Sequence, residues 1–311
     1  MEFHYRAMEA KRGALDDSDD DDETMRLTQS SNGNTLLTWH QLPAWMHDNQ
    51  YITDSYRRPT GSYKECAKTL FYLHNEYVNI WTHLLGFLLF LGLGIHFLWS
   101  HSSSDNLTWV DRIYVGAFIV SALTCLGCSC LFHCFSCHSE HIATIWNRCD
   151  YVGIVTLAVG SCFPLIYYGF QCHRLYQGSK NENENKTAIV LMKRFRTPAY
   201  RRRRTTTFIG LACLGLVPGF HGIYLYGYTR SLDTISLINM IMVGGIYVGG
   251  AFLYAARIPE RWSPGTFNLF GSSHQIFHVC VLIALVTHYY GVMKAMAYWH
   301  SGGHDICHGF P

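Results

Sequence analysis

Two histidines spaced four residues apart stand at the start of the last apolar run of the chain. They are His274 and His278, and the run that follows, from Val279 to Val292, carries His288 and no formal charge. Residues four apart on a helix lie on one face, so two imidazoles there can meet one metal ion. Ionisable side chains where a helix enters hydrocarbon indicate a functional site. On its own, the spacing also fits histidines that are hydrogen-bonded within a protein core.

A second set of polar side chains lies at the ends of two other apolar runs. Ser129 and His133, again four apart, lie near the end of the run at 113–134, and Asp150 opens the next run, which continues to Phe170. Consecutive membrane spans end and begin on the same side, so we expect these three side chains at one membrane edge. A carboxylate there is costly without a partner. Asp150 is therefore expected either to pair with a neighbour or to anchor the interface.

Three histidines from two helices, His133, His274 and His278, form a candidate set of imidazole ligands. With Zn²⁺ such a set leaves the fourth tetrahedral position for water, and zinc lowers the pKa of that water to about 7. Asp150 could accept a hydrogen bond or a proton from the water, and Ser129 could donate to a carbonyl oxygen or orient a ligand. A site in the inner leaflet suits a lipid amide or ester better than a soluble substrate. The same side chains could instead bind metal as a structural clamp between helices.

The elements that position these residues are apolar segments of membrane-spanning length. The chain has 311 residues, of which 49% are hydrophobic and 15% charged, with a net charge of +2. Six segments approach the roughly 20 residues that cross a bilayer, which predicts an all-α integral membrane protein. No secretory signal precedes them, because the first 30 residues contain no apolar run. We expect no nucleic-acid partner. The predicted spans are 78–99, 113–134, 150–170, 206–226, 234–255 and 274–290.

The remaining segments divide the chain into parts. Residues 1–35 carry the acidic run at 16–23 and no apolar face, so they are predicted to form a disordered tail. Residues 36–75 are predicted to form a cytosolic segment that ends in an interfacial amphipathic helix, because its last apolar residues recur at helical spacing. The transmembrane bundle is expected at 76–293, and a lumenal or extracellular tail at 294–311.

Basic residues predict the orientation in the membrane. Arg57, Arg58, Lys64 and Lys68 precede the first span, and arginines also follow the fifth. Lys and Arg concentrate in cytosolic loops, so the N-terminus and all the candidate ligands are expected on the cytosolic side. This orientation requires residues 171–205, which are polar and rich in arginine, to recross the membrane. No apolar segment there is long enough, so six spans are readable where seven are needed.

Four motifs of the chain resemble the progestin and adipoQ receptor family, which includes the adiponectin receptors and is related to hemolysin III. The resemblance covers about residues 42–291. The motifs, in the order of the family, are NIWTHLLG at 79–86, FSCHSE at 135–140, ARIPER at 256–261 and SSHQIFH at 272–278. YITD at 51–54 and FGSSH at 270–274 are more similar to the Golgi-resident member that tethers Raf kinase, whereas AARIPER at 255–261 is more similar to the adiponectin receptors.

This resemblance implies a bundle of seven helices with a cytosolic N-terminus and a lumenal C-terminus. It implies that zinc binds to His133, His274 and His278, with Asp150 and Ser129 beside the metal-bound water as catalytic residues. The implied substrate is ceramide or another membrane lipid amide, whose amide bond would be hydrolysed as in ceramidases. A hormone-like extracellular ligand is a further implied partner.

The resemblance also implies an alternative function and a departure from the family pattern. The alternative is a non-enzymatic Golgi membrane scaffold that holds a signalling kinase through residues 1–75. The Golgi or the plasma membrane is the expected location. The family's fourth span belongs between Phe170 and Arg194, where this sequence has none.

The 12 cysteines fall mostly in or beside the apolar runs. Such cysteines are typically small packing residues rather than a disulfide framework, although a bridge between Cys172 and Cys307 is possible. Cys134, Cys137 and His138 imitate a zinc knuckle, but the second cysteine pair that such a site needs is absent nearby.

Overall fold

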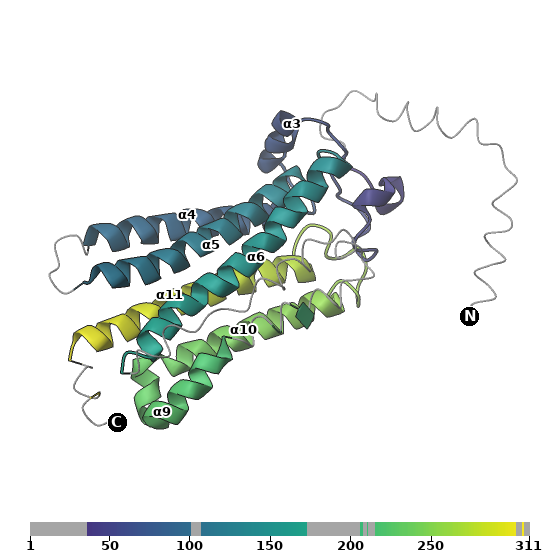
Figure 1. Ribbon diagram of the computed structural model, residues 1–311. Helices are drawn as coiled ribbons and strands as arrows, with labels where there is room; N and C mark the ends of the chain where they lie inside the picture. Colours follow the sequence, from purple (N-terminus) through teal and green to yellow (C-terminus); the bar gives the residue numbers. More distant parts are fainter. Residues whose placement is uncertain are drawn as a thin grey trace, which may run out of the picture. The chain divides into compact units, whose positions relative to one another are not determined.

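Long apolar helices form the frame of the protein (Figure 1). The computed structural model describes residues 36–100, 107–172, 206–207, 210, 215–302 and 307. Within these ranges no strand occurs, and one isolated antiparallel bridge joins Leu37 and Tyr56. The predicted all-α membrane protein is confirmed. The five helices in the described ranges that are long and apolar enough to cross a bilayer are α4 (Tyr77–Ser100), α5 (Trp109–Phe135), α6 (Glu140–Gly169), α10 (Leu237–Ala256) and α11 (Ser273–His300).

Helix α6 begins at Glu140, not at Asp150 as the sequence predicted. The Ser139 side chain caps the helix by accepting a hydrogen bond from the Ile142 N–H, and Glu140 lies in the first turn, where a negative charge is favourable. The helix therefore extends beyond its apolar stretch. Asp150 lies almost three turns inside it and is 8% exposed. The prediction that Asp150 starts this helix was wrong because capping, not hydropathy, decides where a helix begins.

Helix α9 (Leu216–Thr234) occupies part of the region where the fourth readable span was expected at 206–226. Residues 206, 207 and 210 are also helical. Pro218 stands in the first turn of α9, where a proline's missing N–H costs no hydrogen bond. Pro218 therefore does not interrupt the helix. The backbone departs from helical geometry at Gly227, with φ 74°, where glycine adopts positive φ without steric cost.

Some of the predicted segments fall outside the described residues. These are the acidic tail at 1–35, most of the insert at 171–205, which includes the place of the family's fourth span, and the end of the C-terminal tail.

Helix α5 has extensive contacts with two neighbouring helices. It packs most extensively against α6 and then against α4, and 50% of its apolar stretch is buried, whereas 28% is buried in α4. A Cβ added to Gly160 would lie 2.2 Å from Ser121 Oγ, and one added to Gly153 would lie 2.9 Å from Cys125 Cα. In a bilayer, such close packing is what holds helices together. These glycines therefore set the distance between the two helices that carry Ser129, His133 and Asp150.

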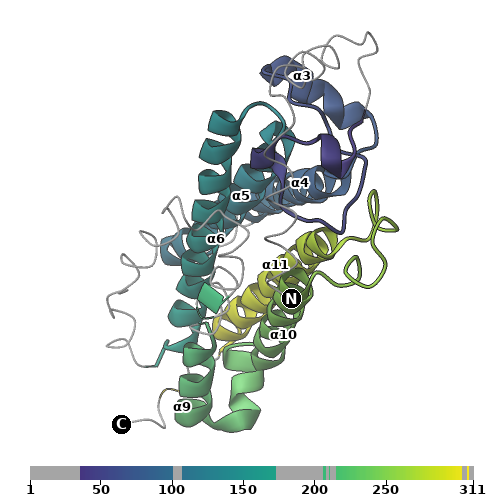
Figure 2. The same cartoon turned by 90° about the vertical axis from the view of Figure 1, so that its right-hand side faces the viewer.

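Helices α10 and α11 lie side by side in both views (Figure 1 and Figure 2). A Cβ added to Gly250 of α10 would lie 2.8 Å from the Cβ of Cys280 in α11, so this pair is also closely packed. Helix α11 contacts α4, α5, α6 and α9 as well. It thereby brings His274 and His278 toward the end of α5.

A layer of short helices precedes α4 at the end of the bundle where α5 ends and α11 begins (Figure 1). Within this layer, the backbone N–H groups of Thr60 and Gly61 donate to the carbonyls of Cys137 and His138, each at 2.9 Å. We call residues 36–76 the N-terminal layer. Its helices are η1 (Trp39–Gln41), η2 (Ala44–Met46), α3 (Tyr63–Lys68) and η3 (Thr69–Phe71).

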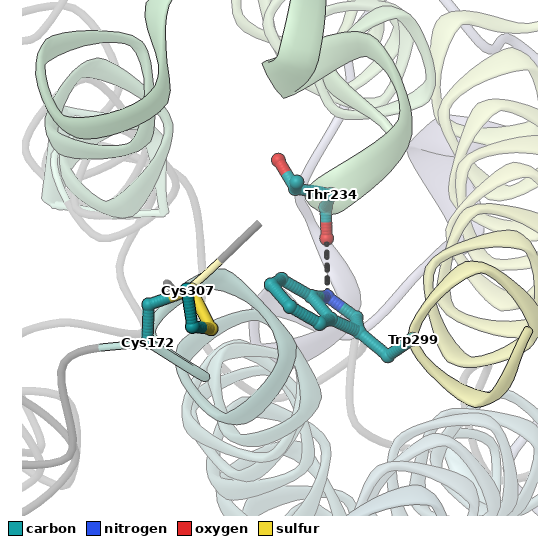
Figure 3. Close-up of a disulfide and its surroundings, with 4 residues drawn as sticks. All are labelled: Cys172, Thr234, Trp299 and Cys307. Carbon is teal, nitrogen blue, oxygen red and sulfur yellow. Dashed lines mark hydrogen bonds between the residues drawn. A yellow bond between two sulfur atoms is a disulfide. The ribbon is translucent and has the colours of Figure 1, made fainter. Parts of the chain in front are cut away.

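The opposite end of the bundle is held by a disulfide and a buried indole (Figure 3). Cys172, just after α6, is bonded to Cys307, 135 residues later in the chain. In α11, Trp299 is 2% exposed, and its Nε1 donates to the carbonyl of Thr234 at the end of α9 at 3.1 Å. The ends of α6, α9 and α11 are thus fixed far from the histidines at the other end of α11.

Candidate metal centre

Three imidazoles from α5 and α11 converge at the end of the bundle next to the N-terminal layer. The Nε2 atom of His274 lies 3.2 Å from His133 Nε2 and 3.2 Å from His278 Nε2. The three nitrogens all lie within 4.8 Å of one another, with His133 and His278 buried and His274 partly so. The structure therefore brings together all three histidines that the sequence singled out as metal ligands.

The geometry of this trio fits a tetrahedral metal. Zn–N bonds of 2.0–2.1 Å at tetrahedral angles place two ligand nitrogens about 3.3 Å apart, close to the two 3.2 Å separations. Hydrogen bonds alone do not satisfy the cluster. A neutral imidazole has one donor and one acceptor, and a single proton on His274 Nε2 can serve only one of its two neighbours. A cation shared by the three lone pairs resolves this conflict.

Glu76 orients the first of these ligands. Its Oε2 lies 2.7 Å from His133 Nδ1 and accepts a hydrogen bond from Asn79 Nδ2 at 2.6 Å. Burial by itself raises the pKa of Glu76, but the nearby His133 and His274 rings and these hydrogen bonds outweigh it and hold the pKa below its usual range. A proton on His133 Nδ1 leaves the lone pair on Nε2, facing the other imidazoles. A carboxylate behind a histidine is typical of metal sites.

Glu76 is not among the site residues predicted from the sequence. The signal that could have found it is a single acidic residue directly before the first span. By the rule applied to Asp150, such a charge at a membrane edge calls for a partner. The partner is 57 residues away in the chain, so the sequence alone could not identify it.

Asp150 and Ser129 form a second polar pair beside the histidines. Ser129 is 2% exposed, and its hydroxyl lies near the carboxyl of Asp150, which is also near His133. The buried Asp150 carboxyl therefore has polar neighbours. The structure places both residues at the site, and their catalytic roles remain predictions.

Two cavities meet at these side chains. The larger, of about 1050 Å³, lies under the N-terminal layer and is lined by polar groups that include Arg57, Glu76 and His133. The smaller, of about 190 Å³, runs between α5, α6, α10 and α11 and is lined mainly by apolar side chains. The residues that line both cavities are Asp150, Tyr151, Tyr254 and His274. A ligand with a polar and an apolar part could therefore have its junction at the histidines.

Arg57 fixes the end of α5 to the N-terminal layer. Its buried guanidinium donates to the carbonyls of His133 and Cys134, at 2.5 and 2.9 Å. It also donates to the Ser136 and Thr69 hydroxyls. These carbonyls belong to the last turn of α5, where a cation interacts favourably with the helix dipole. From the sequence alone, Arg57 indicated only the orientation in the membrane.

Glu260 fixes the start of α11 in a similar way. This carboxylate is fully buried and accepts hydrogen bonds from the Ser273 N–H at 2.7 Å, from the Ser273 hydroxyl and from Asn49 Nδ2 at 3.0 Å. It thus caps the helix that begins with Ser273 and carries His274 in its first turn. The bond from Asn49 ties this cap to the N-terminal layer.

Two further histidines, His83 and His288, lie in the packed interior of the bundle. The His83 ring stacks on His278 with centroids 3.8 Å apart, and the His288 Nε2 lies 3.2 Å from the Ser161 carbonyl. Within the described residues, Cys134, Cys137 and His138 form no cluster with metal-site geometry. The knuckle-like spacing there therefore has no counterpart in the structure.

Comparison with known proteins agrees with the motifs. A family described as haemolysin-III related matches residues 71–289. The adiponectin receptor protein of Drosophila melanogaster is 37% identical over 265 residues, which are 84% of this chain and 59% of that protein. Progestin and adipoQ receptor-like protein 1 of Caenorhabditis elegans is 36% identical, over 83% of this chain and 60% of its own length. Progestin and adipoQ receptor family member 3 of Mus musculus is 34% identical, over 86% and 88%. The chain thus spans about 60% of the length of the fly and nematode relatives.

Proposed function

Because this chain belongs to the haemolysin-III related family of progestin and adipoQ receptor-like membrane proteins, we propose that it is a receptor-like protein with zinc at His133, His274 and His278. We further propose that it hydrolyses lipid amides of the ceramide type at this site. The observation that carries the proposal is the convergence of three imidazole nitrogens next to a buried carboxylate and a hydroxyl.

Each side chain has a distinct task in this proposal. Zn²⁺ held by His133, His274 and His278 would supply a Lewis acid and would lower the pKa of a water molecule at the site to about 7. Glu76 keeps the proton of His133 on Nδ1, so that Nε2 is free to act as a ligand. Asp150 accepts the proton of the attacking water and later returns it to the leaving amine. Ser129, whose hydroxyl lies near the Asp150 carboxyl, orients that carboxyl.

The two cavities support an amphiphilic substrate. The larger cavity offers space and polar groups for a headgroup, and the smaller one offers apolar walls for a chain. Asp150 and His274 line both, so the bond at the junction of head and chain would lie beside them. In a ceramide-like lipid, that bond is the amide.

The proposed orientation has the N-terminus in the cytosol and the C-terminus in the lumen or outside the cell. The Cys172–Cys307 disulfide supports it, because disulfides persist in oxidising compartments. The proposed receptor role follows the names of relatives that are called receptors. The kinase-scaffold alternative remains a prediction. That alternative places the kinase on residues 1–75. Deletion of residues 1–35 tests the first part of this region and leaves the N-terminal layer in place. Retained kinase binding would show that residues 1–35 do not hold the kinase.

Metal analysis of the purified full chain tests the proposal. We expect about one zinc per chain in the wild type and its loss in His274→Ala, because two imidazoles do not complete the ligand set. His40→Ala, which changes an exposed histidine of the N-terminal layer, is the matched control and should retain the metal. A wild-type protein that binds no zinc would refute the metal site.

Hydrolysis is tested separately with a short-chain fluorescent ceramide. Asp150→Asn should retain zinc and lose turnover, since the amide cannot accept the proton. A wild type that retains zinc but never hydrolyses the lipid would leave a structural metal clamp and contradict the enzymatic proposal.

A further inference from the structure

A pair of cysteines lies at the same end of the bundle, outside the metal centre. Cys66 of α3 and Cys137, just after α5, have their sulfurs 3.6 Å apart, and both side chains are fully buried. A disulfide bond is about 2.05 Å long, so the sulfurs need to approach by only about 1.5 Å. The fold thus brings the thiols of two residues that are 71 positions apart in the chain close to disulfide-bonding distance.

The backbone around the pair is already aligned. Thr60 and Gly61 donate hydrogen bonds to the carbonyls of Cys137 and His138, and the Thr60 hydroxyl lies 3.1 Å from the Cys66 sulfur. These contacts hold the segment before α3 against the turn after α5. Bond formation would therefore require little movement of the main chain.

The two thiols differ in chemical character. The hydrogen bond between the two thiols, together with the Arg57 guanidinium, holds the pKa of the Cys137 thiol below its usual range. The same hydrogen bond raises the pKa of Cys66. The four acceptors that Arg57 contacts are neutral, so a thiolate at Cys137 would also place a negative charge near this buried cation. An activated thiolate beside a second thiol is the arrangement of redox-active cysteine pairs.

Cys66 belongs to α3, which is a short surface helix. It spans six residues, Tyr63–Lys68, and Tyr63, Glu65 and Lys68 on it are exposed. Short surface helices open locally at low free-energy cost. Such opening gives small reagents access to sulfurs that are buried in the closed state.

We propose that Cys66 and Cys137 form a reversible redox site, which closes to a disulfide by exchange with glutathione disulfide. The Cys137 thiolate attacks one sulfur of glutathione disulfide and releases one glutathione thiolate. Cys66 then loses its proton to solvent, attacks the Cys137 sulfur of the mixed disulfide and releases the second glutathione thiolate. The two protein thiols are oxidised, and one glutathione disulfide is reduced to two molecules of glutathione.

The new bond would tether α3 to the end of α5. Arg57 already bridges the N-terminal layer to the carbonyl of His133, so the disulfide acts on the element that carries a proposed zinc ligand. In the reduced form α3 can open, and in the oxidised form it is held closed. The Cys66–Cys137 pair therefore adds redox control of the N-terminal layer to the proposed zinc-dependent hydrolysis, which is not itself a redox reaction.

Thiol mapping of the full chain in lipid nanodiscs tests this proposal. The protein is equilibrated in buffers of stepped reduced-to-oxidised glutathione ratio, quenched with N-ethylmaleimide and digested without reduction. We expect Cys66 and Cys137 to lose alkylation together and to appear as one linked peptide lighter by two hydrogens. Excess reduced glutathione should restore both thiols. Hydrogen exchange of the α3 amides should be slower in the oxidised form.

Two substitutions give controls. Cys66→Ser removes the resolving thiol, so Cys137 should accumulate as a mixed disulfide with glutathione. Cys134→Ser, whose sulfur lies nearby with a 3.9 Å contact to the Cys66 carbonyl, should keep the Cys66–Cys137 link. The proposal is overturned if both thiols stay alkylatable at every ratio, if fragment spectra assign the link to Cys134, or if the link resists excess reduced glutathione. Since no step involves zinc, failure here is separate from failure of the metal site.

Discussion

At the scale of single residues, the site depends on groups that hold the histidines as much as on the histidines. The carboxylate of Glu76 lies against Nδ1 of the His133 ring, and the guanidinium of Arg57 donates to the His133 carbonyl. The first sets which ring nitrogen faces the cluster, and the second fixes the last turn of α5. A ligand constrained in both ways loses little entropy when it binds a metal.

Glu76→Gln tests the first of these constraints. The amide can still accept a hydrogen bond from His133 Nδ1 but carries no charge, so the imidazole becomes a weaker ligand. We expect zinc affinity to fall about 10–100-fold, measured by competition with a chelator of known affinity. Glu65→Gln removes an exposed carboxylate that pairs with Lys68 and should leave the affinity unchanged. Equal affinity in both variants would show that Glu76 has no role at the metal.

At the scale of elements, close helix packing and helix capping position the ligands. Gly153 and Gly160 let α6 pack closely against α5. The start of α11 is capped by the buried carboxylate of Glu260 in the preceding loop. Neither feature touches the proposed metal. Both decide whether side chains from different helices arrive at one point.

Gly153→Ala tests the packing of α5 on α6. The added Cβ would lie 2.9 Å from the Cα of Cys125, a backbone atom that cannot rotate away, so the helices must separate. Overpacking of this kind costs about 1–3 kcal/mol, and we expect a lower thermal midpoint together with weaker zinc retention. Gly92→Ala in α4, where an added Cβ meets nothing within 4 Å, is the control. If both variants behave alike, this contact does not set the helix spacing.

Glu260→Ala tests the cap of α11. It leaves Ser273 and Asn49 without their buried acceptor, and hydrogen bonds to charged groups contribute about 1.5–3 kcal/mol each. We expect the free energy of unfolding to fall by about 2–4 kcal/mol and hydrogen exchange to rise in the first turn of α11. Glu260→Gln keeps one acceptor and should show a smaller effect. Unchanged exchange at residues 273–277 in the alanine variant would contradict the capping role.

At the scale of the whole molecule, the two ends of the bundle are stabilised by different means. The histidine end is joined by buried polar contacts between the N-terminal layer and the ends of α5 and α11. The other end is joined by the Cys172–Cys307 disulfide and the Trp299 hydrogen bond (Figure 3). The two ends can therefore be perturbed independently.

Cys172→Ser tests this independence. The bond links residues 135 apart in the chain, and its loss is expected to cost about 2–5 kcal/mol, seen as a lower thermal midpoint. Zinc content should not change, because the histidines lie at the other end. Cys162→Ser, which alters an unbridged cysteine of α6, is the control and should have little effect. Loss of zinc together with the disulfide would show that the two ends are coupled.

The sequence by itself determined the features that depend on local pattern. Hydropathy and length predicted the apolar helices, four-residue spacing placed His274 beside His278, and the motifs indicated the family. These rest on the helical period and on segment length, which neighbouring residues set. The start of α6 was misplaced because its capping residues lie outside the apolar stretch that hydropathy detects.

Only the tertiary structure decided which distant groups meet. His133 and His274 are 141 residues apart in the chain, and Glu76 and His133 are 57 apart. Their meeting depends on how closely α5, α6 and α11 pack, which follows from the shapes of side chains on facing surfaces. The same holds for Arg57, Glu260 and the Cys66–Cys137 pair. A charged residue at the edge of an apolar segment indicates in the sequence that a partner is needed. Only the folded chain shows which residue that partner is.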